Sequence, residues 1–115
     1  MKLPDAEKAQ VTEAQVVRYL LSTTHRAGRS KAVLFMEFGF DPNRWEELAQ
    51  ALKQHAMDNE VARIEKTEFG TRYVIDGPLK AADERWLNIR TAWYIDKDGD
   101  PPRFVTAHPL RRRRV

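Results

Sequence analysis

The sequence comprises 115 residues, 42% of them hydrophobic, with a formal net charge of +3 at pH 7. This composition excludes a fully disordered chain, and no apolar run approaches the ~20 residues that a membrane helix requires. Cysteine is absent, which excludes disulfides and thiolate nucleophiles and is compatible with the cytoplasmic location that we expect. We predict a single domain over residues 1–110 and a basic tail over residues 111–115.

The positive charge is concentrated at the end of the chain. Arg103 and the arginines at 111–114 follow the last acid, so residues 1–102 hold 15 cations against 17 acids. The excess of positive charge therefore comes from the tail, and a run of terminal arginines is more typical of a solvated end than of a folded site. Bound to nucleic acid, such a tail would add a salt-sensitive attraction to phosphates.

Helical signals dominate the first half. Thr12-Glu13-Ala14-Gln15 matches a capping box, and the apolar spacing after it predicts a helix up to about Ser22. Residues 31–38 are nearly all apolar; Ser30 as N-cap and Gly39 as stop favour a short helix, with a buried strand as the alternative. Asp41-Pro42 starts a third helix, which ends near Met57. Its predicted buried face comprises Trp45, Leu48, Leu52 and Ala56.

Strand signals begin at residue 61 and continue almost to the end. We predict strands over 61–68, 71–76, 86–96 and 103–108, with turns at Phe69-Gly70, at Gly77-Pro78 and over 97–102. Helices followed by a four-stranded antiparallel meander predict an α+β fold, with the N-terminal helices packed on one face of the sheet.

Alternation along the strands assigns residues to the two faces of this sheet. Toward the helices we place Tyr73, Ile75, Leu87, Ile89, Trp93, Ile95, Val105 and Ala107. The open face would then carry Arg72, Arg90, Tyr94, Thr106 and His108. One face of an antiparallel sheet is often solvated, so polar residues there do not require a function by themselves.

A basic connection, residues 24–31 (Thr-His-Arg-Ala-Gly-Arg-Ser-Lys), joins the first two helices. Cations and helix N-terminal amides both attract phosphate, so we predict a phosphate site here, formed by Arg26, Gly28, Arg29 and Ser30. His25 is either a general acid or base or a cap of the preceding helix. Lys31 either stabilises a phosphate or extends from a buried helix with its ammonium in water.

The open face supplies further candidates. Arg72 and Arg90 either stabilise a phosphate or form cross-strand ion pairs with acids. Thr106 and His108 could position a substrate or transfer a proton. We interpret His55, near the end of the third helix, as structural. The three histidines show no metal-ligand spacing and no cofactor fingerprint occurs, so we predict neither a metal nor a cofactor.

Several stretches together resemble an uncharacterised family of small bacterial domains found in toxin-like and mobile-element contexts. The matching stretches are residues 3–9, 25–32, 38–40, 70–73, 77–79, 90–93 and 105–109. The resemblance spans almost the whole chain before the tail and implies no known activity. It is compatible with a small cognate antitoxin or immunity protein as partner.

A second resemblance is architectural. Leading helices, a four-stranded sheet and a final Val-Thr-Ala-x-Pro strand are similar to the barnase, EndoU, colicin and RelE group of metal-independent ribonucleases. The resemblance implies basic and hydroxyl residues on the open face and an RNA substrate, whether tRNA or mRNA. Where such sequences often have a tyrosine before the proline, this chain has His108.

We therefore favour a toxin-type, metal-independent endoribonuclease that acts by general acid–base transesterification. Its candidate catalytic residues are His25, Lys31, Arg72, Arg90, Thr106 and His108. The first alternative is a non-catalytic module that binds nucleic acid or protein, such as one member of an operon-encoded pair. The second is an interaction domain that contacts another chain through its sheet edge or Trp86. None of these functions involves a membrane.

Overall fold

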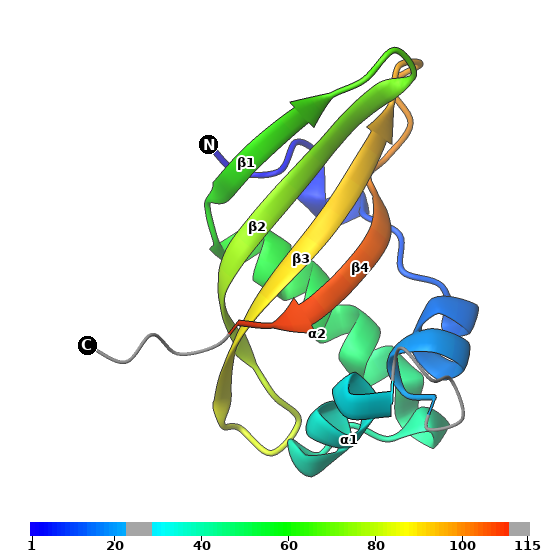
Figure 1. The fold of residues 1–115 in the computed structure, drawn as a ribbon, viewed down its shortest axis with the longest axis vertical. Coiled ribbons are helices and arrows are strands. Elements are labelled where there is room, and N and C mark those ends of the chain that lie inside the picture. Colours follow the sequence, from blue (N-terminus) through cyan, green and yellow to red (C-terminus); the bar gives the residue numbers. More distant parts are fainter. Residues whose placement is uncertain (23–28, 111–115) are drawn as a thin grey trace.

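The computed structural model describes residues 1–22 and 29–110, with side chains in the second range from residue 31 onward. Helices precede the sheet along the chain, as Figure 1 shows. The elements are η1 (Ala6–Lys8), η2 (Gln15–Leu20), α1 (Arg29–Glu37), η3 (Pro42–Arg44), α2 (Trp45–Asp58), β1 (Val61–Lys66), β2 (Gly70–Lys80), β3 (Trp86–Asp96) and β4 (Arg103–Pro109). The strands form one antiparallel sheet in the order β1-β2-β3-β4, which confirms the predicted α+β fold.

The first helical segment begins with the predicted capping box. The Thr12 amide donates to Gln15 Oε1 at 3.1 Å, and the Gln15 amide donates to Thr12 Oγ1 at 3.2 Å. The next turns are π-helical, because the Leu21 amide reaches back five residues to the Val16 carbonyl. Such wide turns occur mostly as short insertions and often lie at functional sites.

The next two helices largely match their predictions. Residues 31–37 are helical, as favoured over a strand, and Gly39 ends the segment with a φ of 95°. However, α1 already begins at Arg29, so Ser30 lies inside the helix and is not its N-cap. Asp41 accepts from the Asn43 amide at 2.8 Å and caps the 3-10 turn η3, which leads directly into α2.

The predicted turn at Gly77-Pro78 is wrong, because β2 continues to Lys80, which pairs with Trp86 of β3. Pairing between β1 and β2 reaches only Ile75, so β2 is an edge strand beyond that residue, and proline is tolerated at an edge. Gly77 makes room for the Asn59 side chain, which donates to the His55 and Pro78 carbonyls and would collide with a Cβ at position 77.

The predicted inward position of Val105 is also wrong. The register between β3 and β4 shifts after the Ala92–Thr106 pair, so that Trp93 pairs with Phe104 and Val105 is the extra residue of a bulge. Val105 is therefore 41% exposed, whereas Phe104 is buried with its ring 5.4 Å from that of Trp93. Thr106 and His108 keep the parity predicted for the open face.

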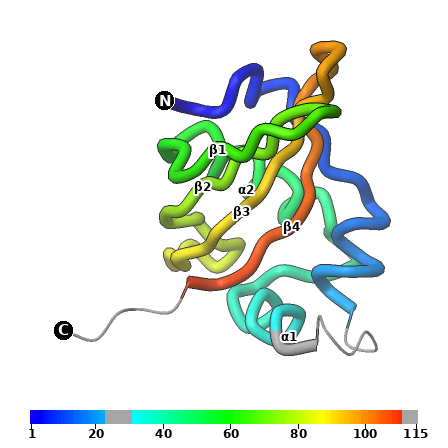
Figure 2. Tube along the Cα trace, turned by 45° about the horizontal axis from the view of Figure 1, so that its top comes forward, coloured from blue at the N-terminus to red at the C-terminus, as the bar shows by residue number. Residues whose placement is uncertain are grey.

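The main core lies between the sheet and α2, which crosses behind the strands in Figure 1. The segments η2 and α1 lie instead on the β4 side of the sheet (Figure 2). Gln15 ties η2 to this edge, because its Nε2 donates to the Phe104 carbonyl at 2.6 Å. In residues 1–22 and 29–110, no helix combines the length and apolar character needed to cross a bilayer.

Candidate functional site

Polar side chains gather where the open face of the sheet meets η2 and α1. Cross-strand register places Asp76, Arg90 and His108 side by side on β2, β3 and β4, with Thr106 two residues before His108. Tyr19 of η2 and Lys31 of α1 approach from the β4 edge. We call these six residues, all of them half-buried, the open-face cluster: Tyr19, Lys31, Asp76, Arg90, Thr106 and His108.

A bidentate ion pair organises the centre of the cluster. Arg90 donates from Nε to Asp76 Oδ1 at 2.7 Å and from Nη2 to Oδ2 at 2.9 Å. The pair lowers the pKa of Asp76 and raises that of Arg90. The cross-strand alternative for Arg90 is therefore the one that the structure shows. A guanidinium has five N–H donors in a fixed plane, so an oriented Arg90 keeps donors that could bind a phosphate.

Tyr19 is the polarised hydroxyl of the cluster. Lys31 Nζ donates to the Tyr19 oxygen at 3.3 Å and lies 5.3 Å from the centre of its ring. A hydrogen bond with Thr106, and secondly that with Lys31, lower the pKa of Tyr19 because both favour the phenolate. A phenol in this setting is a better proton donor than a free tyrosine.

His108 lies among cations. Burial contributes most to lowering the pKa of His108, and the charges of Lys31 and Arg90 lower it further, while Asp76 acts in the opposite direction. An imidazole with a pKa below 6.5 is neutral at pH 7 and is free to accept a proton. The cluster thus combines a proton acceptor, a proton donor and two cations.

Arg72 lies at the margin of this arrangement. It pairs in register with Tyr94, and its positive charge contributes only weakly to the lowered pKa of His108. Arg72 Nε is 3.8 Å from Glu65 Oε1, and both atoms are buried without a hydrogen-bond partner among the described residues. Arg72 therefore forms the predicted alternative, a cross-strand ion pair, in a loose geometry.

Most of the predicted phosphate site in the basic connection lies outside the described residues. His25, Arg26 and Gly28 lie outside the described residues, as does the arginine tail, residues 111–115. The side chains of Arg29 and Ser30 also lie outside them, although their backbone belongs to α1. The structure thus brings together Lys31, Arg90, Thr106 and His108 from the predicted set.

Two members of the cluster were missed at the sequence level. Asp76 was detectable in principle, because it has the same strand parity as Arg72 and precedes a predicted turn. Tyr19 was not, because its contacts with Lys31 and Thr106 join segments that are distant in the sequence.

His55 has a different environment on the covered face of the sheet. The side chain is 1% exposed, and its Nε2 lies 3.1 Å from the Gly77 carbonyl oxygen. A carbonyl only accepts, so Nε2 carries the proton and Nδ1 accepts from the Thr91 hydroxyl at 3.2 Å. Trp93 Nε1 donates to the same hydroxyl oxygen at 2.9 Å. This buried chain of hydrogen bonds supports the structural interpretation of His55.

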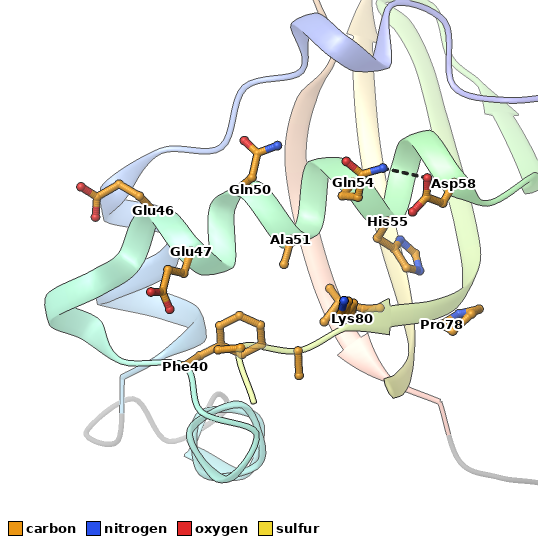
Figure 3. A pocket seen from close by; sticks show the side chains of 13 residues that line it. Phe40, Glu46, Glu47, Gln50, Ala51, Gln54, His55, Asp58, Pro78 and Lys80 are labelled. Atoms are coloured by element: carbon orange, nitrogen blue, oxygen red, sulfur yellow. Dashed lines mark hydrogen bonds between the residues drawn. The ribbon is translucent and has the colours of Figure 1, made fainter. Parts of the chain in front are cut away.

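A groove of about 570 Å³ lies apart from the cluster, between α2 and the end of β2 (Figure 3). Its lining includes three acidic residues, Glu46, Glu47 and Asp58, and one basic residue, Lys80. An acidic lining repels a polyanion, so this groove is a poorer phosphate site than the open-face cluster with its two cations. Within residues 1–22 and 29–110, no three His, Asp or Glu side chains gather closely enough to hold a metal ion.

Comparison with known proteins places the chain in context. The model of a family described as Domain of unknown function (DUF6883) matches residues 2–111. The fold is similar to that of a chain in the contact-dependent growth inhibition toxin–immunity protein complex from Klebsiella pneumoniae 342, with a TM-score of 0.68 and 17% identity. The alignment covers 90% of this chain and 99% of that one. No curated protein matches the chain in sequence.

Proposed function

We propose that this chain, which belongs to the DUF6883 family of domains of unknown function, is a toxin-type endoribonuclease that cleaves RNA without a metal. The observation that carries the proposal is the open-face cluster, in which a neutral imidazole and a polarised phenol lie among cations. The likeness of the fold to a chain of a toxin–immunity protein complex supports a role in such a system.

The reaction is an internal transesterification. His108 accepts the proton of a ribose 2′-hydroxyl, and the 2′-oxygen attacks the adjacent phosphorus. The bond from phosphorus to the 5′-oxygen of the next nucleotide breaks, and Tyr19 gives that oxygen its proton. The products are a 2′,3′-cyclic phosphate and a 5′-hydroxyl, and exchange with water restores both side chains. Each correctly placed acid or base contributes a factor of about 10²–10⁴ to the rate.

The remaining residues of the cluster bind and orient the phosphate. Lys31 and Arg90 stabilise the extra negative charge of the pentacoordinate phosphorus, Asp76 holds Arg90 in place, and Thr106 orients Tyr19. Arg72 extends the positive charge along β2. His25 is a second candidate for the acid, and Arg26, Gly28, Arg29 and Ser30 are proposed to bind flanking phosphates.

The direct test is incubation of purified protein with total RNA in the presence of a chelator. We expect fragments with cyclic phosphate ends from the wild type and from Lys53→Ala, which removes a half-buried lysine of α2 behind the sheet. His108→Ala, Tyr19→Phe and Lys31→Ala should each reduce the cleavage rate strongly. His25→Ala distinguishes the two candidate acids. Intact RNA with wild-type protein, or full activity of His108→Ala, would contradict the proposal.

A protein partner is a second component of the proposed function. The structural neighbour belongs to an assembly of a toxin with its immunity protein, which favours a small cognate immunity protein or antitoxin for this chain. Co-expression with the product of the adjacent gene should give a complex in which cleavage is blocked. If the stripped protein leaves RNA intact, the alternative of a non-catalytic binding module is preferred.

A further inference from the structure

An exposed tryptophan begins the strand that carries Arg90. Trp86 is the first residue of β3, and its side chain is 62% exposed. Trp86, Asn88 and Arg90 alternate along the strand, so all three have the parity of the open face. Leu87 and Ile89 have the opposite parity, and both belong to the core or pack against it. The indole is therefore held on the same face as the open-face cluster.

Regular strand pairing holds the backbone at Trp86 in place. The ladder between β2 and β3 is continuous from the Gly70–Asp96 pair to the Lys80–Trp86 pair, without a bulge. Trp86 lies four positions before Arg90, which corresponds to about 13 Å along a strand. Trp86 is thus within reach of a nucleotide that neighbours one bound at the cluster.

Trp86 differs in position from the other exposed large hydrophobic residues of the described chain. Phe69 lies in the turn between β1 and β2, Val105 in the β4 bulge, Val33 and Met57 on helices, Ile64 on the edge strand β1, and Met1 before the first helical segment. An indole in water exposes a large apolar surface, and aromatic side chains stack well on bases of any sequence. An exposed aromatic ring beside a cationic site is the usual composition of a single-strand binding surface.

We propose that Trp86 is the stacking platform for a base of single-stranded RNA that flanks the phosphate bound by the open-face cluster. This inference rests on the proposed function and adds a substrate subsite to it. Arg90 and Lys31 hold the phosphate, the indole stacks on the neighbouring base, and the exposed amide of Asn88 lies between them in the strand. Because any base can stack on an indole, the subsite favours unpaired strands and does not select a particular sequence.

The experiment measures binding rather than cleavage. The probe is a fluorescent single-stranded oligoribonucleotide with 2′-O-methyl riboses, which cannot undergo transesterification. Fluorescence anisotropy should show that Trp86→Ala weakens binding about 5- to 140-fold, the usual effect of losing one stacked base. Trp86→Phe should retain most of the affinity. Phe69→Ala is the matched control, because that ring is also exposed but lies in the hairpin turn.

An oligonucleotide series locates the stacked base. Replacing one base at a time by an abasic site should give one position at which wild type and Trp86→Ala bind equally weakly. Equal affinity of the wild type and Trp86→Ala, or no binding of the probe by the wild type, overturns the subsite. Loss of binding to a co-encoded protein with RNA affinity unchanged also overturns it, in favour of a protein interface at Trp86.

Failure of the Trp86 subsite can be distinguished from failure of the proposed ribonuclease function. If the wild type cleaves RNA but Trp86→Ala binds the probe normally, the subsite is wrong and the ribonuclease assignment stands. If the probe binds through Trp86 but no RNA is cleaved, the subsite stands as part of a non-catalytic binding surface.

Discussion

One described histidine lies against each face of the sheet, His55 from α2 and His108 from β4, and the two differ in what surrounds them. His55 lies behind the sheet, fully buried, with both ring nitrogens in contact with groups of β2 and β3. His108 lies on the open face, half-buried, among Lys31, Arg90 and Asp76. Burial is the first cause of a lowered pKa in both.

A lowered histidine pKa therefore has different consequences on the two faces. Both ring nitrogens of His55 are hydrogen-bonded to fixed internal partners, so its neutral form serves the packing between α2 and the sheet. His108 is neutral beside solvent and beside groups that attract phosphate, so its lone pair is available to a substrate. A shifted pKa is typical of functional sites, but structural hydrogen-bond networks also shift pKa values. A functional role is indicated only where the group with the shifted pKa is accessible to a substrate.

The largest effect should come from truncating the open-face histidine. His108→Ala should lower the cleavage rate about 10²–10⁴-fold and change the free energy of unfolding by less than about 0.5 kcal/mol. Single-turnover cleavage and urea unfolding measure the two quantities. A variant that loses stability in proportion to activity would make His108 a second structural histidine.

Truncating the covered histidine should produce the opposite result. His55→Ala leaves a cavity and removes the acceptor of the Thr91 hydroxyl proton, which should lower the free energy of unfolding by about 2–4 kcal/mol. The cleavage rate per folded molecule should equal that of the wild type. Reduced cleavage by protein that calorimetry shows to be folded would indicate that the two faces are coupled.

The smallest expected effect is a dependence of stability on pH. Both histidines have a lower pKa in the folded protein than the unfolded value near 6.5, so the unfolded chain binds protons more readily. Their contribution to stability is complete above pH 6.5 and is lost as the pH falls from there toward the folded-state pKa values. Urea unfolding between pH 8 and pH 5 should show this decline, and His55→Gln should make it shallower. A decline of unchanged slope in that variant would assign the titration to other groups.

Much of the fold was predictable, because local signals and tertiary packing agree in most of the chain. The capping box at Thr12, the stop at Gly39 and the alternation along β3 all act within a few residues, and each one is confirmed. The prediction was wrong where a distant element decided the outcome. β2 can continue through Pro78 because its pairing with β1 does not extend beyond Ile75. The residues around Pro78 do not reveal where that pairing stops.

The candidate site also contains residues that local patterns predicted and residues whose position depends on distant elements. Strand parity correctly placed Arg90, Thr106 and His108 on one face. The inward prediction for Val105 was wrong because a bulge shifts the register by one residue, and sequence alternation does not reveal a bulge. Tyr19 was overlooked because its contacts with Lys31 and Thr106 depend on how η2 packs against β4.

The geometry of the open-face cluster depends on the number of residues between Gln15 and Tyr19 in the π-helical segment η2. Gln15 anchors the start of the segment to β4, and the direction of each later side chain depends on how many residues separate it from that anchor along the wide turns. Deleting Val17 would therefore preserve the composition of the segment almost entirely and yet turn the Tyr19 hydroxyl away from Lys31. The spacing between anchor and phenol is thus as much a determinant of the site as the identity of either side chain.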